Sequence, residues 1–212
     1  MRYQLRPMRI EDVPQANEID RECFPTQWPP SYKRDLLFRG PTHYLVACEE
    51  GAGPAVEQTG EGGTGIGRLL RKLRHPLHGD KVSASNQKVV GLVGLWIMAG
   101  EAHITTIGVR EAYRRQGIGE LLLIAAIEMA LIQNAHLVTL EVRASNTAAQ
   151  ALYEKYGFTK VGVRPGYYTD NREDALIMST DTITSASFQS RFQRLKRAHG
   201  ERWGFTQTLV DK

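Results

Sequence analysis

One run of the sequence combines arginines and glycines in a way that suits an anionic ligand. Arg114-Arg115-Gln116-Gly117-Ile118-Gly119 lies between a predicted strand and a predicted buried helix. The first N–H groups of a helix have no partner within it, and they form the positive end of its dipole. Glycines let the backbone approach a bulky anion and arginines add charge, so the run indicates a pyrophosphate site. An ordinary basic turn between a strand and a helix is the alternative interpretation.

Two familiar phosphate-binding patterns are absent from this run. No lysine followed by serine or threonine completes a Walker motif, and the spacing is not that of the three-glycine dinucleotide fingerprint. A second glycine-rich run, Gly63-Thr64-Gly65-Ile66-Gly67, follows no predicted strand. We therefore expect only the first run to bind phosphate.

The elements that must position this turn follow from the spacing of apolar residues. Alternating runs predict strands, and apolar residues three or four apart predict helices. The predicted strands are 3–8, 42–48, 89–98, 101–109, 137–144, 158–163 and 174–179, and the predicted helices are 11–24, 31–38, 117–134, 146–156 and 188–197. Helix–strand alternation in the second half requires crossover connections. We predict an α/β (α+β) fold with one mixed sheet of about six to seven strands, about four flanking helices and a basic C-terminal helical tail.

Length and composition limit the alternatives. The 212 residues are 42% hydrophobic and 24% charged, which is typical of globular proteins and excludes overall disorder. The most apolar run, Leu121–Ile127, is bounded by glutamates and is far shorter than the ~20 residues that cross a bilayer. The N-terminus has no apolar signal core, and Cys23 and Cys48 fit no metal-ligand spacing. We therefore expect a cytoplasmic protein with reduced thiols, no membrane span and no metal.

Two segments differ from the rest of the chain. Residues 51–87 hold eight of the twenty glycines and a basic run, 68–75, and residues 183–212 are polar and basic. The first segment carries 5 basic and 3 acidic residues and the second 6 and 2, which leaves 16 basic and 18 acidic residues elsewhere. The net charge of +4 therefore belongs to these additions. We predict one domain over 1–182 with a flexible insertion at 51–87, and a basic extension over 183–212.

The two basic segments have more than one interpretation. They could contact RNA or another anionic surface through 68–75 and 188–202. A solvated charged face is the usual meaning of such runs. In the extension, Phe188, Phe192 and Leu195 recur near helical spacing, so it could instead pack on the main domain or on a neighbouring chain.

The glycine-containing turn resembles the R/Q-x-x-G-x-G/A signature of the GNAT acetyltransferases. Further runs resemble the RimI-type ribosomal-protein alanine N-acetyltransferases within that superfamily. They are Leu140-Glu141-Val142-Arg143-Ala144-Ser145-Asn146, Ala151-Leu152-Tyr153-Glu154-Lys155-Tyr156-Gly157-Phe158, and Gly166-Tyr167-Tyr168 followed by Glu173-Asp174-Ala175-Leu176-Ile177-Met178. The resemblance is weak over 1–50 and strong over 88–180. It implies the GNAT fold and direct transfer of an acetyl group from acetyl-CoA to an amine.

The resemblance also implies which residues bind the coenzyme. The backbone of Ile107, Gly108 and Val109 would hold the pantetheine and polarise the thioester. The pyrophosphate would lie against the turn, whose residues are Arg114, Arg115, Gln116, Gly117, Ile118, Gly119 and Glu120. Asn146 would contact the coenzyme too, although its place before a predicted helix is also explained by capping alone.

A carboxylate in the middle of a predicted strand is the candidate general base. In 137–144, alternation puts Glu141 on the face opposite Val138, Leu140 and Val142. Helices should cover much of both faces of the sheet, so we expect Glu141 to line a cleft. The resemblance implies that it is the general base. An ion pair with Arg143 is the structural alternative, and Glu101 competes as the base or as a group that orients the substrate.

Tyr153 is the candidate acid. Its spacing with Ala149, Leu152 and Tyr156 by itself indicates a core position, whereas the resemblance implies that it protonates the departing thiolate. In water, proton transfer from a phenol of pKa near 10 to a thiolate of pKa about 8.5 is uphill by roughly 2 kcal/mol. The site would have to assist this step.

The acceptor is constrained by the chemistry of amines. An α-amine has a pKa near 7.8 and a lysine near 10.4, a difference of about 3.5 kcal/mol in the cost of deprotonation. A glutamate acting through water serves an α-amine more readily. This agrees with the N-terminal acceptor, beginning with alanine or serine and possibly ribosomal, that the resemblance implies. Tyr167 and Tyr168 are candidates for the peptide groove, as are Phe24 and Trp28.

Two other functions stay open. A GNAT enzyme for a small-molecule amine or a lysine side chain would lack the combined Leu-Glu-Val-Arg-Ala-Ser-Asn and Gly-Tyr-Tyr runs. A non-catalytic module associated with coenzyme or RNA is the third hypothesis. The presence of both Glu141 and Tyr153 argues against it.

Overall fold

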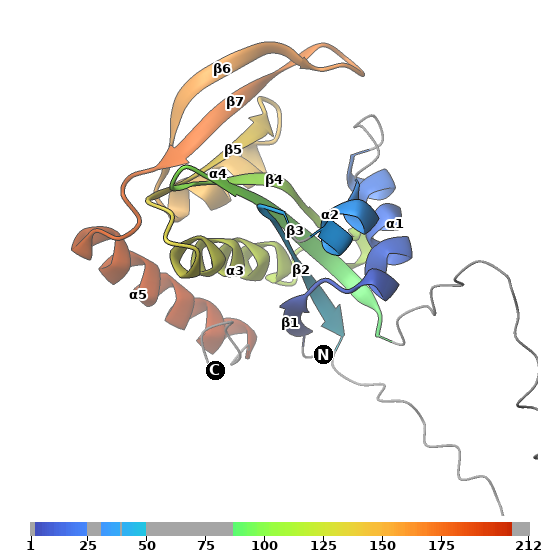
Figure 1. Ribbon diagram of the computed structural model, residues 1–212. Coiled ribbons are helices and arrows are strands. Elements are labelled where there is room, and N and C mark those ends of the chain that lie inside the picture. The colour runs from blue at the N-terminus through green and yellow to red at the C-terminus, as the bar shows by residue number, and fades with distance from the viewer. Residues whose placement is uncertain (1–2, 25–30, 39, 50–86, 205–212) are drawn as a thin grey trace, which may run out of the picture.

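The computed structural model describes residues 3–24, 31–38, 40–49 and 87–204, which form a seven-stranded mixed sheet with helices on both faces (Figure 1). The strands are β1 (Tyr3–Pro7), β2 (Thr42–Glu49), β3 (Val89–Met98), β4 (Glu101–Val109), β5 (Leu137–Arg143), β6 (Phe158–Tyr168) and β7 (Glu173–Thr180). Their order in the sheet is β1-β2-β3-β4-β5-β7-β6. Neighbours are antiparallel except β4 and β5, which are parallel. The predicted mixed sheet is confirmed.

Two groups of helices cover the sheet. The first group is α1 (Val13–Cys23) and α2 (Tyr32–Phe38), which bury Ile19 and Tyr32 against β2 and β3. The second is α3 (Ile118–Ile132) and α4 (Thr147–Lys155), which share the larger apolar cluster. Short 3₁₀ turns, η1 (Ile10–Asp12) and η3 (Glu111–Tyr113), precede α1 and α3. α3 is apolar nearly all round because it lies between the sheet and a further helix, α5 (Ala186–Trp203) (Figure 1).

The two parallel strands separate part-way along their length. β4 and β5 are paired from Glu101↔Leu137 to Ile104↔Leu140 and no further. The register between β3 and β4 shifts at Thr105, which has no partner residue on β3. An extra residue of this kind bends its strand and increases the local twist. The second half of β4 therefore turns away from β5, and the sheet opens at its centre.

The last hairpin is longer than predicted. Residues 164–168 belong to β6, so the prediction of a loop there, based on Pro165-Gly166-Tyr167-Tyr168, is wrong. β6 is the edge strand of the sheet, where a proline removes no ladder hydrogen bond. Gly166 takes a left-handed φ of 57°, and the register with β7 is irregular between Arg164 and Tyr168. The hairpin therefore arches over the sheet with both tyrosines on a strand (Figure 1).

The basic extension packs on the domain. α5 begins after Ser185, whose hydroxyl accepts a hydrogen bond from Phe188 N, and is longer than the predicted 188–197. Phe188 and Phe192 are buried, and the Phe192 ring meets Tyr156 edge-on at 6.3 Å. The docking interpretation of the extension is thus confirmed. The predicted insertion lies outside the described residues except for Gln87, and with it the basic run 68–75 and the second glycine run.

Candidate active site

The predicted anion-binding turn has the backbone of an anion site. Gly117 is the N-cap of α3 with φ 78°, and Arg115 also takes a positive φ, 63°. The first N–H that bonds within α3 is that of Leu121, which donates to Gly117 O at 2.9 Å. The N–H groups of residues 118–120 precede it and point out of the helix end. Left-handed residues beside a helix N-terminus form a concave set of N–H donors, which fits a pyrophosphate.

Side chains of the turn support its shape. Arg114 Nε donates to Val109 O at 3.2 Å, and Gln116 accepts from the Tyr3 hydroxyl at 2.7 Å. The Glu120 carboxylate points away from the turn, toward the Lys155 ammonium and the Tyr156 hydroxyl. Burial would raise the Glu120 pKa, but these two hydrogen bonds outweigh it and lower the pKa. Glu120 can therefore serve an anion only through its N–H.

The strip Ile107-Gly108-Val109 lies along the opening in the sheet. It is paired with β3 on one side, and on the β5 side it lies beyond the last paired residue, Ile104. Val109 O on this strip already accepts from Arg114 Nε, and the predicted pantetheine contact of the strip stays a prediction. The absence of a side chain at Gly108 lets the end of α1 approach, because a Cβ there would lie 3.1 Å from Cys23 Sγ.

Glu141 faces the same opening from β5. Its side chain is only 9% exposed, and it has two cationic or hydrogen-bonding partners. His103 Nε2 lies 2.9 Å from Oε2, and Arg164 Nε lies 3.0 Å from Oε1. The hydrogen bond with His103 is the main reason that the Glu141 pKa is lowered, despite burial. Glu141 is therefore a carboxylate at neutral pH.

The predicted alternative partner of Glu141 is wrong. Arg143 instead pairs with Asp170 at 2.9 Å and Glu173 at 3.2 Å, at the end of the β6–β7 hairpin. Successive odd-numbered residues of β5 lie on one face, but the long Arg143 side chain reaches acids from the next hairpin. Arg143 thereby anchors the hairpin, and Glu141 is left to face the opening.

Sequence reasoning did not identify two neighbours of Glu141. His103 lies opposite Thr139 in the parallel register of β4 and β5, and its Nδ1 is 3.0 Å from Thr139 Oγ1. Arg164 comes from β6, in the stretch predicted as a loop. Strand alternation places Thr139 and Glu141 on one face of β5. Knowledge of the register between β4 and β5 would also have placed His103 beside them. The sequence contains no signal for that register.

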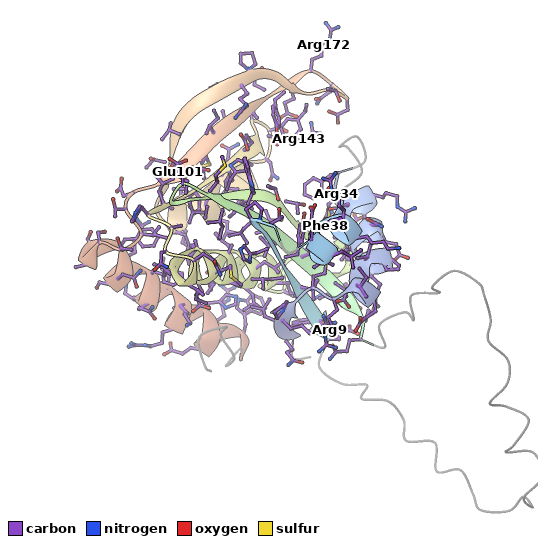
Figure 2. The ribbon with its side chains drawn as sticks, in the orientation of Figure 1. Arg9, Arg34, Phe38, Glu101, Arg143 and Arg172 are labelled. Carbon is purple, nitrogen blue, oxygen red and sulfur yellow. The ribbon has the colours of Figure 1, made fainter. Side chains whose placement is uncertain are left out.

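Glu101 is not brought to this group. It is exposed in the hairpin that joins β3 to β4 and pairs in register with Leu137, four residues before Glu141 (Figure 2). Four residues of strand span about 13 Å. Glu101 also lies at the paired end of β4 and β5, away from the opening. Its position does not favour the competing base role.

Tyr153 is buried on α4. It is 6% exposed, and its ring packs on Phe158 at 5.7 Å, so the predicted core position is correct. Burial, and secondarily Tyr168, raises the Tyr153 pKa well above 10. The hydroxyl keeps its proton at neutral pH and can donate a hydrogen bond. Its role toward a leaving thiolate stays a prediction.

The two hairpin tyrosines stand beside Glu141. Their rings meet edge-on at 5.2 Å, and Glu141 contributes to raising the pKa of both, after burial. The Arg143 guanidinium lies 3.8 Å from the Tyr168 ring centre, and that of Arg164 lies 5.7 Å from the Tyr167 ring centre. Tyr167 is 43% exposed. A ligand that reaches Glu141 from this side would meet an aromatic wall.

For the remaining predicted residues that it describes, the structure gives a position but does not test the predicted contact with a ligand. Asn146 is exposed and caps α4 by accepting from Ala149 N at 3.2 Å, so the capping role is confirmed and the coenzyme contact stays a prediction. Phe24 is half-buried, and its ring reaches Gly108, where a Cβ would lie 3.3 Å away. Trp28 lies outside the described residues.

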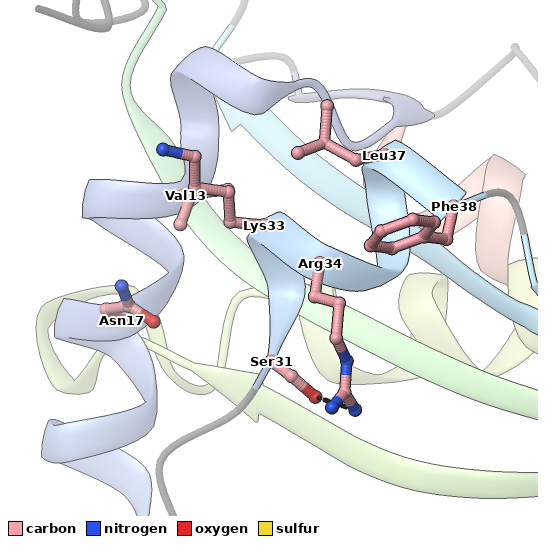
Figure 3. Close-up of a pocket in the computed structure, with 7 residues that line it drawn as sticks. All are labelled: Val13, Asn17, Ser31, Lys33, Arg34, Leu37 and Phe38. Carbon is pink, nitrogen blue, oxygen red and sulfur yellow. Dashed lines mark hydrogen bonds between the residues drawn. The ribbon is translucent and has the colours of Figure 1, made fainter. Parts of the chain in front are cut away.

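A separate pocket lies between α1 and α2. It has a volume of about 540 Å³ and contains none of the predicted site residues (Figure 3). Leu37 and Phe38 are strongly exposed beside it, and Arg34 donates to the Ser31 hydroxyl at 3.2 Å across its rim. Within the described ranges, no three His, Cys, Asp or Glu side chains gather as metal ligands, and no helix is long and apolar enough to cross a membrane.

Comparisons with known proteins identify the family of this chain. The model of the acetyltransferase (GNAT) family matches residues 63–158. A Bacillus subtilis protein, provisionally named a ribosomal protein bS18-alanine N-acetyltransferase, is 34% identical over 82% of this chain and 92% of its own. An N-alpha-acetyltransferase of Sulfurisphaera tokodaii is 33% identical over 84% and 92%. The crystal structure of the Escherichia coli ribosomal-protein-S18-alanine N-acetyltransferase covers 87% of this chain and 96% of its own, with TM-score 0.61 and 26% identity.

Proposed function

Because this chain belongs to the GNAT family of N-acetyltransferases, which use acetyl-CoA, we propose that it acetylates the N-terminal α-amine of a protein. Two relatives of nearly full-length coverage carry names for this activity, one on an alanine of ribosomal protein bS18. The observation that carries the proposal is the Glu141 carboxylate, buried at the opening between β4 and β5 and hydrogen-bonded to His103. Acetyl-CoA supplies an activated acetyl thioester.

Glu141 is the proposed general base. Its lowered pKa keeps it ionised at neutral pH, so it can accept a proton from the attacking amine through a water molecule. The hydrogen bonds from His103 and Arg164 that lower this pKa also make Glu141 a weaker base. An α-amine of pKa near 7.8 is neutral in about one molecule in seven at pH 7, so it needs only modest assistance. A lysine needs far more.

His103 and Arg164 hold the base in position. Each binds a different oxygen of Glu141, which fixes the plane of the carboxylate. His103 is itself positioned by Thr139 through its other ring nitrogen. A catalytic group fixed by packing and hydrogen bonds loses little entropy when the reaction occurs.

We assign the activation of the thioester to β4 and the stabilisation of the departing thiolate to Tyr153. Backbone N–H groups of the strip Ile107-Gly108-Val109 would polarise the thioester carbonyl, as in an oxyanion hole. Burial of Tyr153 makes complete proton transfer to the thiolate more costly than it is in water. We therefore assign Tyr153 a hydrogen bond to the departing sulfur, with proton transfer completed only as the thiolate gains charge.

The acceptor peptide would enter between the hairpin and the end of α1. Tyr167 and Tyr168 form one wall, and Phe24 contributes to the other. The proposed first residue is small, alanine or serine, since one relative is named for acetylating an alanine. A ribosomal protein is the proposed acceptor and the cytoplasm the proposed location; Cys23 and Cys48 are both free thiols.

An acceptor series tests this function. Acetyl-CoA is offered with peptides that begin with alanine, serine, methionine or lysine, and with the same peptides N-terminally blocked but carrying a lysine side chain. We expect transfer to free α-amines, fastest with alanine and serine. Transfer only to blocked peptides would assign the enzyme to lysine side chains, and transfer only to free polyamines would assign it to small amines.

Contact with RNA or another anionic surface remains a separate prediction. In α5, Arg191 donates to the carbonyl oxygens of Glu154 and Lys155, and Lys196 pairs with Glu128, so both cations face the domain. Arg194, Arg197 and Arg202 remain exposed. The basic run 68–75 lies outside the described residues.

A further inference from the structure

We propose that α5 is part of the coenzyme site, because His199 and Trp203 hold the Gly117 turn in its anion-binding conformation. This inference rests on the proposed assignment of that turn to the pyrophosphate. The two residues are one helical turn apart on the same face of α5, and they act on the turn rather than on the reacting atoms. Both are therefore positioning residues.

His199 and Trp203 contact Gly117 from two directions. His199 Nε2 lies 3.0 Å from Gly117 O, and since a carbonyl only accepts, the ring nitrogen donates. This is the carbonyl that also accepts the first helical bond of α3, from Leu121 N. The Trp203 ring lies directly against Gly117, because a Cβ there would be 2.7 Å from Cε2 and Nε1. The Trp203 contact therefore requires a glycine at this position, whereas the His199 contact holds its carbonyl.

The turn needs such support because its backbone is costly. Arg115 and Gly117 both have positive φ, and Arg115 has a side chain that disfavours this region. Residues in sparsely populated conformations persist only when the surrounding structure holds them there. Tyr3 contributes through Gln116, and α5 contributes at Gly117. Because these contacts hold the turn in place beforehand, no binding energy of the anion is needed to order it.

α5 is held firmly enough to give this support. Its Phe188 and Phe192 are buried in the main apolar cluster. Lys196 pairs with Glu128, a buried carboxylate of α3 whose burial would be costly without a cation. His199 is 4% exposed, and burial is the main reason that its pKa is lowered, so the imidazole donates as a neutral group at pH 7. α5 is therefore attached to α3 near both ends of α3, through Lys196 and Glu128 at one end and through His199 and Gly117 at the other.

Two acetyl donors of different length can distinguish a role of α5 at the pyrophosphate from a general role in stabilising the fold. Acetyl-CoA contains the pyrophosphate, whereas S-acetyl-pantetheine carries the same thioester without it. The variant His199→Leu removes the hydrogen bond to Gly117, and His199→Gln keeps a side-chain N–H donor. Trp203→Ala removes the second contact, and Gln193→Ala, at an exposed position of α5, is the matched control.

We expect His199→Leu to raise the KM for acetyl-CoA and the Kd for coenzyme A about fivefold, the scale of one hydrogen bond, with little change in kcat. His199→Gln should recover most of this loss, Trp203→Ala should resemble His199→Leu, and Gln193→Ala should match the wild type. Turnover of S-acetyl-pantetheine should be unchanged in every variant.

Two results would overturn the inference. An equal loss with both donors would mean that α5 only stabilises the fold, and no loss with either would mean that the turn does not need it. The Kd measurement does not depend on turnover. If the wild type bound coenzyme A but acetylated no peptide, the proposed function would fail while the comparison of Kd values still decided the role of α5.

Discussion

The Gly117 turn, which is the proposed pyrophosphate site, and the group around Glu141, which is the proposed transfer site, are built in opposite ways. The turn offers backbone groups: its N–H groups come from residues 118–120, Arg114 supports the loop, and the Glu120 carboxylate points elsewhere. The proposed base of the transfer site is set instead by side chains from three strands, with Glu141 on β5, His103 on β4 and Arg164 on β6. The turn should thus be sensitive to changes in backbone conformation, and the transfer site to the loss of single polar atoms.

The largest expected effect is on the transfer site. Glu141→Gln keeps the size of the side chain but removes the proposed base, so kcat should fall about 10²-fold or more at neutral pH, the scale of general-base catalysis. The Kd for coenzyme A, measured by calorimetry, should stay near that of the wild type. Glu101→Gln is the matching change of an exposed carboxylate, and a larger loss in that variant would transfer the base role to Glu101.

Tyr153→Phe should lower kcat roughly ten- to a hundredfold, since a hydrogen bond to a charged group is worth about 1.5–3 kcal/mol. The ring and its packing on Phe158 remain, so the fold and the coenzyme affinity should be preserved. Steady-state kinetics and a binding titration check this together. Weaker coenzyme binding at unchanged kcat would make Tyr153 a binding contact. Tyr153 would then belong with the Gly117 turn rather than with the proposed transfer site.

Gly117→Ala should act on the turn and leave the chemistry alone. A side chain at a left-handed φ costs about 1–2 kcal/mol, and here it would also meet Trp203, so the Kd for coenzyme A should rise about tenfold or more. Gly119→Ala is the comparison within the same turn, because its Cβ would lie 3.9 Å from Val109. Equal losses in the two variants would show that backbone conformation is not the cause.

The smallest effect is a dependence on pH. The Glu141 pKa is lowered, so this carboxylate stays ionised as pH falls to its ordinary value of 4.5 and below. The kcat/KM for a peptide should then follow its α-amine alone and rise about tenfold between pH 6.8 and 8.8. A profile from pH 5.5 to 9.5 with a second acidic inflection would contradict the ionised Glu141.

The same contrast explains what the sequence could predict. The turn is contiguous, and its glycines and the helix start can be recognised locally. Alternation along β5 was enough to predict which face carries Glu141. His103 and Arg164 could not be predicted, because their positions depend on the parallel register, the bulge at Thr105 and a hairpin whose Pro165-Gly166 suggested a loop. The contact of Trp203 with Gly117 joins residues far apart in the chain, and no local pattern encodes it.

One measurement tests the central claim most directly. A single peptide with a free N-terminal alanine and an internal lysine is incubated with acetyl-CoA and the enzyme, and tandem mass spectrometry locates the acetyl group. The proposed chemistry predicts acetylation of the α-amine, with the lysine unmodified until the α-amine is consumed. Acetylation of the lysine while the α-amine stays free would contradict the account.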